Sequence, residues 1–341
     1  METILMVAHV EADGSLANSA LEALSAAKAL GGSLAVGLIG AQVQAGANQV
    51  AGCGAVRFLG VAGADFAQAR YATDAAAVEA LAKAARATVV VAPATSRLNR
   101  VLTGAAHRCE GRADTHVTAV NIADGAVAIT RWYYRQRMEA VVQRSQRPWF
   151  IALEPGCIAP WQGATGTATV EAVTVTLSAA AKRTQVTGLK APAADQQTIR
   201  PDAALLFVAG AGWTKKQADG QVHVPEAEKL ILDFLRLSQA SLGSSKSLVD
   251  LSGEGQTVLP FMTHLNQIGQ TGATPRHPKG LSTCCHGEEP HVVGWRFVNE
   301  RRAVNLDPNC GWARGKADVL YVADAFQVIT KVIELLAAAG A

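Results

Sequence analysis

With 341 residues, the chain is long enough for roughly two domains of about 150 residues each. Its 31 Lys and Arg residues against 28 Asp and Glu residues leave a net charge of +3, so the overall charge gives no argument for a nucleic-acid or an acidic partner. A hydrophobic content of 49% with only 17% charged residues excludes an intrinsically disordered chain.

The cysteine content and the N-terminal sequence bear on the compartment. Six cysteines are too few for a disulfide scaffold in a chain of this length. No apolar run approaches the roughly 18 residues that cross a bilayer, and METILMVAHVEADG lacks the basic region and apolar core of a signal peptide. We therefore expect a cytoplasmic protein with reduced thiols and no membrane-inserted segment.

The first half of the sequence alternates strand-like and helix-like runs, which is typical of a parallel, doubly wound α/β sheet. The pattern predicts strands at residues 3–10, 34–39, 56–59 and 88–92, and helices at residues 15–30, 41–53, 74–86 and 98–109. Four further strands, at residues 116–122, 126–131, 139–143 and 149–153, follow without helices and predict an antiparallel addition. Alternating β-branched residues continue at 170–177.

A second α/β domain is predicted after a Pro- and Ala-containing stretch, which gives boundaries of 1–185, a linker at 186–202, and 203–341. Its expected strands are residues 203–209, 247–251, 302–306 and 319–322, and its expected helices are 225–242, ended by Gly243, and 325–338. The stretch 275–280 contains two prolines, so we do not expect it to form a central strand.

Short motifs in the second domain suggest a ligand site. Gly210 and Gly212 follow the buried strand at 203–209, where a glycine turn lets backbone N–H groups approach a phosphate. The third glycine of a dinucleotide fingerprint is missing, so an ordinary loop remains an alternative. More specific are four segments in order, namely GSSK at 243–246, IGQTG at 268–272, VNLDP at 304–308 and AD at 317–318.

Read together, these segments resemble the α subunit of the electron-transferring flavoprotein family, as a divergent member. That family carries SGGRG, GASR, VGQTG, GISGAIQH, INKDP and AD in this order, and the match extends over residues 203–336. The first domain is also similar, from ILMVAHV to the VVVAP strand. The resemblance implies an N-terminal doubly wound domain of the adenine nucleotide α-hydrolase type and a C-terminal Rossmann-like domain that binds FAD.

The resemblance also implies roles for individual residues. Thr271 would hydrogen-bond the flavin near N5, Lys246 beside Ser245 would place a cation by the ring, His291 would face the pyrimidine carbonyl, and Asn305 and Asp318 would hold the adenosine end. The implied cofactor-binding residues are Gly210, Gly212, Ser245, Lys246, Gln267, Gly269, Gln270, Thr271, Gly272, His286, His291, Asn305 and Asp318.

The sequence departs from the family pattern in the second domain. Gly212 stands where the family has an arginine, and CCHGEEPH at 284–291 replaces GISGAIQH. Glu288 and Glu289 would place two carboxylates near the position of a pyrophosphate, which is electrostatically unfavourable. These departures support a second hypothesis, an α-like scaffold subunit without a working flavin.

The family resemblance implies a redox carrier and not a stand-alone enzyme, with no catalytic acid or base. Electrons would pass from a substrate dehydrogenase through FAD to an acceptor such as a quinone-linked membrane oxidoreductase. The implied partner is a β-like subunit that carries AMP, in a heterodimer. A third hypothesis, a flavin-dependent dehydrogenase acting on its own substrate, lacks a recognisable base-bearing pocket in the sequence.

Two other clusters admit a functional and a structural interpretation. Cysteines and histidines at 284–286, 291 and 310 could bind a metal, but no C-x₂-C pair exists, so we predict thiols buried or in loops and no metal site. Basic and aromatic residues interleave at 131–137, which could contact nucleic acid. With a near-neutral chain we favour a docking surface for the β-like partner, and His9 is expected to be structural.

Overall fold

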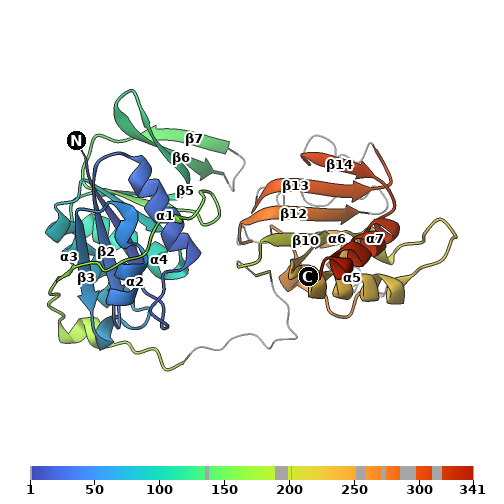
Figure 1. Cartoon of the computed structure of the whole chain (residues 1–341), viewed down its shortest axis with the longest axis horizontal. Helices are drawn as coiled ribbons and strands as arrows, with labels where there is room; N and C mark the ends of the chain where they lie inside the picture. The colour runs from blue at the N-terminus through green and yellow to red at the C-terminus, as the bar shows by residue number, and fades with distance from the viewer. Residues whose placement is uncertain are drawn as a thin grey trace. The chain divides into compact units, whose positions relative to one another are not determined.

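The structure is a computed structural model, and it describes residues 2–134, 138–188, 199–200, 202–250, 258–269, 274–284, 297–308 and 317–340. The chain divides into two compact units, Met1–Leu189 and Lys190–Ala341, which are called here the first and the second unit (Figure 1). Each unit is an α/β structure built on its own sheet, as the sequence pattern predicts. Of the predicted linker, residues 186–188, 199–200 and 202 are described.

The first unit contains a nine-stranded sheet in the order β7-β6-β5-β8-β4-β1-β2-β3-β9. Its strands are β1 Thr3–His9, β2 Ser33–Gly40, β3 Arg57–Ala62, β4 Val89–Pro93, β5 Arg112–Ala123, β6 Ala126–Tyr133, β7 Met138–Gln143, β8 Trp149–Leu153 and β9 Val170–Ala172. β1 pairs with both β2 and β4 in parallel. The strand order therefore reverses beside β1, as expected for a doubly wound sheet.

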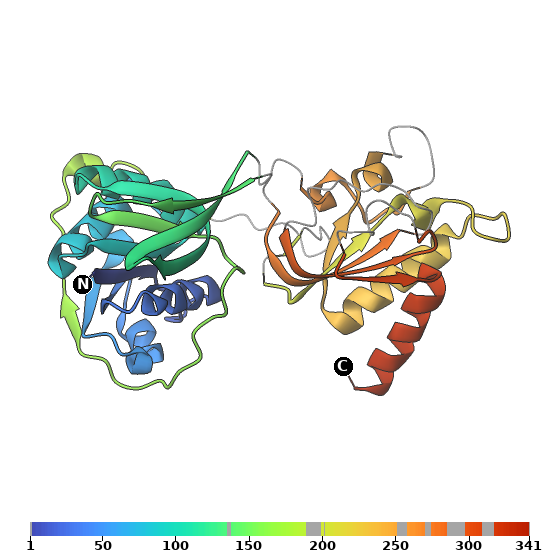
Figure 2. The same ribbon diagram turned by 90° about the horizontal axis from the view of Figure 1, so that it is seen from above.

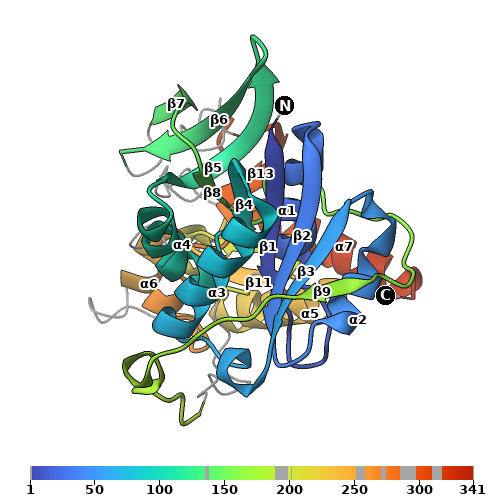
Figure 3. The same cartoon turned by 90° about the vertical axis from the view of Figure 1, so that its left-hand side faces the viewer.

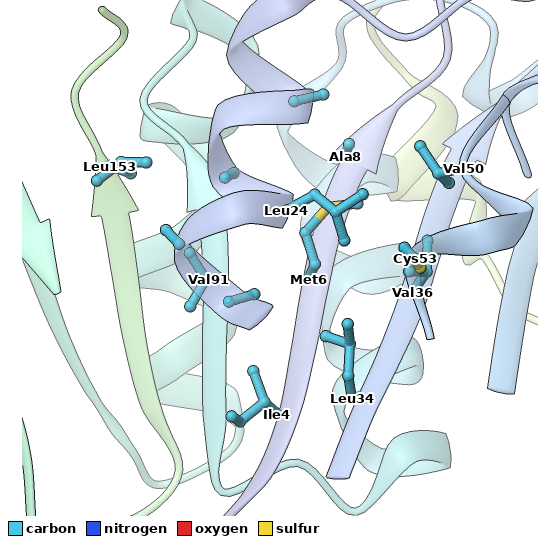
Figure 4. Close-up of a cluster of buried hydrophobic side chains, with 14 of the residues drawn as sticks. Ile4, Met6, Ala8, Leu24, Leu34, Val36, Val50, Cys53, Val91 and Leu153 are labelled. Carbon is cyan, nitrogen blue, oxygen red and sulfur yellow. The ribbon is translucent and has the colours of Figure 1, made fainter. Parts of the chain in front are cut away.

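Helices cover both faces of this sheet, which the sequence pattern predicts for a parallel sheet. They are α1 Asn18–Ala29, α2 Gln44–Gln49, α3 Tyr71–Ala85 and α4 Ser96–Arg108, with short 3₁₀ turns at Ala51–Cys53, Ala64–Phe66 and Ala179–Lys182. Helices α1 and α2 lie on one face of the sheet, and α3 and α4 lie on the other (Figure 3), with a separate apolar core under each pair. Figure 4 shows Leu24 of α1 against Met6 and Val91 in the first of these cores.

The antiparallel addition is smaller than the sequence pattern predicts. β5 and β6, and then β6 and β7, pair antiparallel, but β8 is a parallel strand between β4 and β5. All five residues of β8, WFIAL, are buried, so this strand belongs to the interior of the main sheet. A continuous apolar run is the pattern of a strand that is covered on both faces, which an antiparallel edge is not.

The chain after β8 crosses the first unit to its other edge. There β9 pairs in parallel with β3, and only Val170–Ala172 of the expected strand at 170–177 forms a ladder. Arg57 on β3 forms an ion pair with Glu171 on β9 at 2.7 Å. The second predicted helix is also shorter than expected, because α2 ends at Gln49 and a 3₁₀ turn follows.

The second unit contains a five-stranded parallel sheet in the order β11-β10-β12-β13-β14. Its strands are β10 Leu205–Ala209, β11 Ser241–Ser244, β12 His277–Cys284, β13 Val298–Asn305 and β14 Val319–Val322, and its helices are α5 Val224–Ser238, α6 Lys246–Asp250 and α7 Ala325–Ala338, with 3₁₀ turns at Ala211–Thr214 and His264–Asn266. α5 and α7 lie on the same side of the sheet (Figure 2). A smaller apolar cluster occupies the other side.

Two predictions around residue 243 were wrong. The helix expected over 225–242 ends at Ser238, because Gln239 takes a left-handed conformation and the chain continues into β11. The strand expected over 247–251 is instead the short helix α6, which Ser245 caps by accepting a hydrogen bond from the Leu248 amide at 3.2 Å. A serine followed by a run of helix-compatible residues is the sequence signal of such a cap.

The stretch with two prolines does contribute a central strand, contrary to expectation. β12 begins at His277 and lies between β10 and β13. Its pairing with β10 begins only at Lys279, opposite Leu205. Pro278, which has no N–H to donate, therefore precedes the ladder with β10 and does not interrupt it.

None of the helices in the described part of the chain has both the length and the apolar character that membrane spanning requires.

Candidate functional site at the carboxyl edge of the second sheet

The candidate site lies at the carboxyl ends of the strands in the second unit. The chain passes from β10 to β11 on one side and then to β12 on the other side, so the strand order reverses beside β10. In open α/β sheets, ligands bind at this reversal, outside the carboxyl ends of the strands. The residues that end β10, β11, β12 and β13 are therefore the ones to consider.

The turn after β10 is filled by a tryptophan. Trp213 is 0% exposed, and its indole Nε1 donates to the Thr283 hydroxyl on β12 at 2.7 Å. The Thr283 hydroxyl in turn donates to the Val208 carbonyl at 3.0 Å. The amide of Gly210 donates to the Thr283 carbonyl at 2.8 Å, so this N–H is engaged within the protein, and Gly212 is buried in the following 3₁₀ turn.

The segment after β11 brings two predicted residues, Ser245 and Lys246, to the same edge. Ser245 is buried, and its amide donates to the Ala209 carbonyl at the end of β10 at 2.9 Å. Because its hydroxyl caps α6, Ser245 sets the direction in which Lys246 leaves the sheet. Lys246 is the first residue of α6, and it is exposed.

Residues 267–269 lie against the end of β11. Ser244 and Gln267 form a parallel β-bridge, and the Ile268 amide donates to the Ser244 carbonyl at 3.1 Å. A Cβ on Gly243 would come within 2.7 Å of Ile268, so only glycine allows this approach. Gly269 has a φ of 77°, which also favours glycine, and its amide donates to the Thr274 hydroxyl at 2.7 Å.

β13 ends in a buried polar side chain. Asn305 is 0% exposed, and its Oδ1 accepts a hydrogen bond from the Asp307 amide at 3.1 Å, but its Nδ2 has no partner in the described ranges. The hydroxyls of Ser244 and Ser282 are also fully buried and have no partner there. Buried polar groups are normally hydrogen-bonded, so these three atoms make the edge a candidate ligand site.

Asp318 is the one described predicted residue that lies away from this edge. It immediately precedes β14, and its carboxylate accepts from the Arg301 amide in the middle of β13 at 2.6 Å. Its own amide donates to the Arg301 carbonyl at 2.8 Å. The structure therefore brings together Gly210, Gly212, Ser245, Lys246, Gln267, Gly269 and Asn305, but it places Asp318 at the amino end of its strand.

The first unit has an equivalent edge at the reversal beside β1. Its buried charged side chains pair with each other. Arg97 and Asp74 form a buried ion pair at 2.7 Å, and Arg97 also donates to the Phe66 carbonyl at 2.7 Å. His9 ends β1 with its Nε2 3.1 Å from Glu11, and burial lowers the pKa of this imidazole. The predicted structural role of His9 agrees with this position beside a paired network.

The basic and aromatic segment on β6 is tied to the protein interior. Arg131 binds Asp114 at 2.6 Å and lies over the Tyr133 ring, 4.6 Å from its centroid. Arg144 binds the same carboxylate, and the Trp149 indole donates to it at 2.9 Å. Burial alone would raise the pKa of Asp114, but the hydrogen bonds from Arg144 and Trp149 hold it below its usual range. Tyr134, in contrast, is 73% exposed.

Comparison with known protein families decides the relationship. The family model described as the electron transfer flavoprotein domain matches residues 4–180, which is more than half of the chain. The chain belongs to the electron transfer flavoprotein family. A comparison with curated proteins found no match. The family match covers the first unit, so the ligand residues in the second unit rest on the motif resemblance and on the geometry described above.

Part of the site expected from the electron transfer flavoprotein motifs falls outside the described residues. These positions are Gln270, Thr271, Gly272, His286 and His291. Of the cysteines considered for a metal, Cys285 and Cys310 also lie outside, and Cys284 is described only as the last residue of β12.

Sequence reasoning missed four residues at the carboxyl edge. Trp213 and Thr283 were not singled out, because nothing in the sequence pairs a residue after β10 with one on β12. Ser244 and Ser282 were not singled out either, because the sequence pattern predicts a strand at neither position, whereas the structure places them in β11 and β12.

Proposed function

We propose that this chain is an α-like subunit of an electron transfer flavoprotein and that its second unit binds FAD. The observation that carries the proposal is the coincidence of the family's ordered motifs with the carboxyl edge of a parallel sheet. Seven of the predicted residues come to that edge from three strands and the segment at 267–269. Geometry alone also makes this edge the place where a nucleotide cofactor would bind.

The residues at the edge fit such a cofactor in two respects. Asn305 Nδ2 and the Ser282 hydroxyl are buried hydrogen-bonding groups without a partner in the described ranges, and a heterocyclic cofactor offers the atoms that would pair with them. Gly243 lets the backbone at 267–269 lie close to β11, and Gly269 adopts a positive φ. Gly269 is also the first residue of the GQTG segment, so this segment begins beside the end of β11.

FAD would supply the two-electron redox chemistry when bound, and the protein would supply binding, orientation and electrostatics. Lys246 would favour negative charge on a nearby reduced flavin, since a cation stabilises an adjacent anion. Ser245 would position Lys246 through its cap of α6. Gly210 and Gly212 would shape the turn after β10, and Thr271, Gly272, Gln270, His286 and His291 keep the roles that the resemblance gives them. No general acid or base is required, because no bond of an organic substrate is made or broken.

The two units would have different tasks. The first unit would bind a β-like subunit that carries AMP, with the exposed part of β6 and β7 as the docking surface. Electrons would come from a substrate dehydrogenase and leave to an acceptor such as a quinone-linked membrane oxidoreductase. The proposed heterodimer works in the cytoplasm and docks to its redox partners without inserting into a membrane or binding nucleic acid.

The direct test is a visible absorption spectrum of the full chain purified gently with its co-expressed β-like partner. We expect flavin absorption in the visible range that bleaches on reduction, because the cofactor carries the redox chemistry. Extraction and chromatography would identify FAD. A complex that folds, contains both subunits and carries no flavin even after incubation with FAD would overturn the proposal.

The flavin-free scaffold remains the second candidate, and one observation favours it. Trp213 fills the crevice between β10 and β12, and the Gly210 amide is already engaged there. A pyrophosphate bound at this reversal would have to be held by other groups. Replacing Gly212→Arg restores the family residue, and an unchanged absence of flavin in both forms would support the scaffold.

A further inference from the structure

Two fully buried polar side chains lie on the face of the second sheet that α5 and α7 do not cover. Ser282 on β12 pairs in register with Val208 and Ala303, and both of these belong to the apolar cluster on that face. Asn305 lies two residues beyond Ala303 on β13, so its side chain points to the same face. The two residues are diagonal neighbours on adjacent strands near the carboxyl edge.

Ser282 differs from Thr283 and Ser241, whose hydroxyls have partners within the protein. Ser244 on β11 also lacks a partner in the described ranges, but it pairs with Ala209 and so faces the other side of the sheet. The Thr283 hydroxyl bonds Trp213 and Val208 on the opposite face, and the Ser241 hydroxyl accepts from the Arg200 amide at 2.7 Å. The Ser282 hydroxyl is 0% exposed and has no partner in the described ranges. Leaving a buried hydroxyl unpaired is costly, so a serine at this position suggests that it bonds a group outside the chain.

The surroundings limit what that group can be. The buried side chains around the pair are apolar, and they include Leu206, Val208 and Ile268. Arg301 is the charged residue on this face of β13, and it is paired with Asp318, nearer the amino end of the strand. Apolar walls with two neutral hydrogen-bonding groups suit an uncharged planar ring with a polar edge, whereas a phosphate would need a cation or a row of free amides.

We propose that Ser282, together with Asn305, hydrogen-bonds the polar edge of an uncharged heterocyclic ring of the bound cofactor. Asn305 Nδ2 donates, and the Ser282 hydroxyl donates or accepts. The inference rests on the proposed FAD function, and it adds a ligand contact outside the recognised motifs. FAD has two rings of this chemistry, adenine and isoalloxazine, and both present the required nitrogen and oxygen atoms.

The test compares Ser282→Ala with the wild-type chain, each purified with its co-expressed partner and freed of flavin. FAD and FMN are titrated by absorption and fluorescence, and thermal unfolding is recorded without flavin. We expect FAD to bind about threefold to tenfold more weakly to Ser282→Ala, as the loss of one hydrogen bond predicts. The unfolding temperature of the flavin-free form should stay the same or rise, because the variant removes an unpaired buried hydroxyl.

FMN lacks adenine and therefore separates the two rings. Weaker binding of FAD alone assigns the contact to adenine, and weaker binding of both flavins with a shifted absorption band assigns it to isoalloxazine. Ser238→Ala is the matched control, because its hydroxyl already donates to the Phe234 carbonyl at 2.7 Å within α5. That variant should bind both flavins as the wild type does.

Two results would overturn the inference while leaving the proposed function intact. The first is an unchanged affinity of Ser282→Ala for FAD. The second is a lower unfolding temperature of its flavin-free form, which would mean that the hydroxyl supports the fold. A wild-type complex that binds no flavin would instead overturn the proposed function itself and the inference with it.

Discussion

The two sheets share a reversal of strand order but differ in whether the buried polar side chains beside it have partners. Each strand order reverses beside the first strand, β1 in one unit and β10 in the other, and each reversal carries buried polar side chains. In the first unit Asp74 and Arg97 pair with each other. In the second unit Ser244, Ser282 and Asn305 Nδ2 have no partner in the described ranges. The same topology therefore serves as a closed core in one unit and as a candidate ligand edge in the other.

The first unit also contains buried atoms without a partner, but their context is different. His9 Nδ1 and two nitrogens of Arg70 make no hydrogen bond in the described ranges, but His9 Nε2 lies 3.1 Å from the Glu11 carboxylate and Arg70 Nη1 lies 3.6 Å from the Asp65 carboxylate. Trp132 in the first unit, like Ser244 and Ser282, has a single polar side-chain atom that lacks a partner in the described ranges. Trp132 is only partly buried and lies on β6, away from the reversal beside β1, whereas both serines are fully buried near the reversal of the second sheet. Variants in the two units test this difference.

The largest effect is expected from Arg97→Met. It leaves the Asp74 carboxylate buried at 1% exposure without its cation, which should cost about 3–5 kcal/mol of unfolding free energy. Urea unfolding measures the loss, and the flavin content per folded chain should not change. The double variant Asp74→Leu/Arg97→Met removes both charges and should regain much of the stability. A lowered flavin content in the folded fraction would contradict the division of tasks between the units.

A medium effect is expected from Thr283→Val at the reversal of the second sheet. The substitution leaves the Trp213 indole N–H buried without an acceptor, so the second unit should lose about 1–3 kcal/mol of stability. Denaturant unfolding followed by tryptophan fluorescence measures it. Thr330→Val is the control, because that hydroxyl donates only to the Phe326 carbonyl within α7 at 2.8 Å. Equal losses in the two variants would show that Trp213 does not depend on this bond.

A smaller effect is expected on the flavin potential from Lys246→Gln. Removing the cation should lower the reduction potential, by on the order of 10–30 mV, where 30 mV corresponds to about 1.4 kcal/mol for two electrons. A redox titration of the complex measures the shift, and Lys246→Arg should largely restore the wild-type value. Lys182→Gln removes a lysine that pairs with Asp65 in the first unit at 2.6 Å, and it should leave the potential unchanged.

The smallest effects are expected from pH, with opposite signs in the two units. Burial lowers the pKa of His277, so the unfolded chain protonates first and the second unit loses stability as the pH falls below about 6.5. The hydrogen bond to Glu154 raises the pKa of His116, so its contribution is present below about pH 6.5 and is lost as the pH rises through the folded value.

Thermal unfolding between about pH 5 and pH 8 separates these two contributions. Asparagine tolerates the left-handed backbone at position 116, where φ is 58°. His116→Asn should therefore remove only the loss of stability that His116 causes as the pH rises. His277→Gln should reduce the loss toward low pH, although it also removes contacts to the Arg200 and Pro275 carbonyls. The same pH dependence in wild type and both variants would mean that other groups control the stability of both units.

Much of the architecture could be predicted from the sequence, because strand–helix alternation is a local pattern. The predicted helix at 325–338 has the bounds of α7, and the first strand at 3–10 differs from β1 by one residue. The errors arose where a local sequence preference, such as the exclusion of proline from strands, was overridden by the strand register in the folded protein. Pro278 is tolerated in β12 because the ladder with β10 begins one residue later, and no sequence pattern gives that register.

For the candidate site, too, some features could be predicted from the sequence and others depended on the fold. The order of the motifs gave the family resemblance, and the match over residues 4–180 confirms the family. The motifs also predicted that Ser245, Lys246, Gly269 and Asn305 belong to one site. Their meeting at a single edge, the position of Asp318 away from it and the Trp213–Thr283 bond depend on strand order and register.

By itself, the sequence determined the class of most elements and the family, because periodicity and motifs are local properties of the chain. Only the tertiary structure decided which buried polar groups find a partner, since hydrogen bonds between strands join residues far apart in sequence. For this protein, Asp74 and Arg97 pair with each other, whereas the Ser282 hydroxyl and Asn305 Nδ2 have no partner in the described ranges.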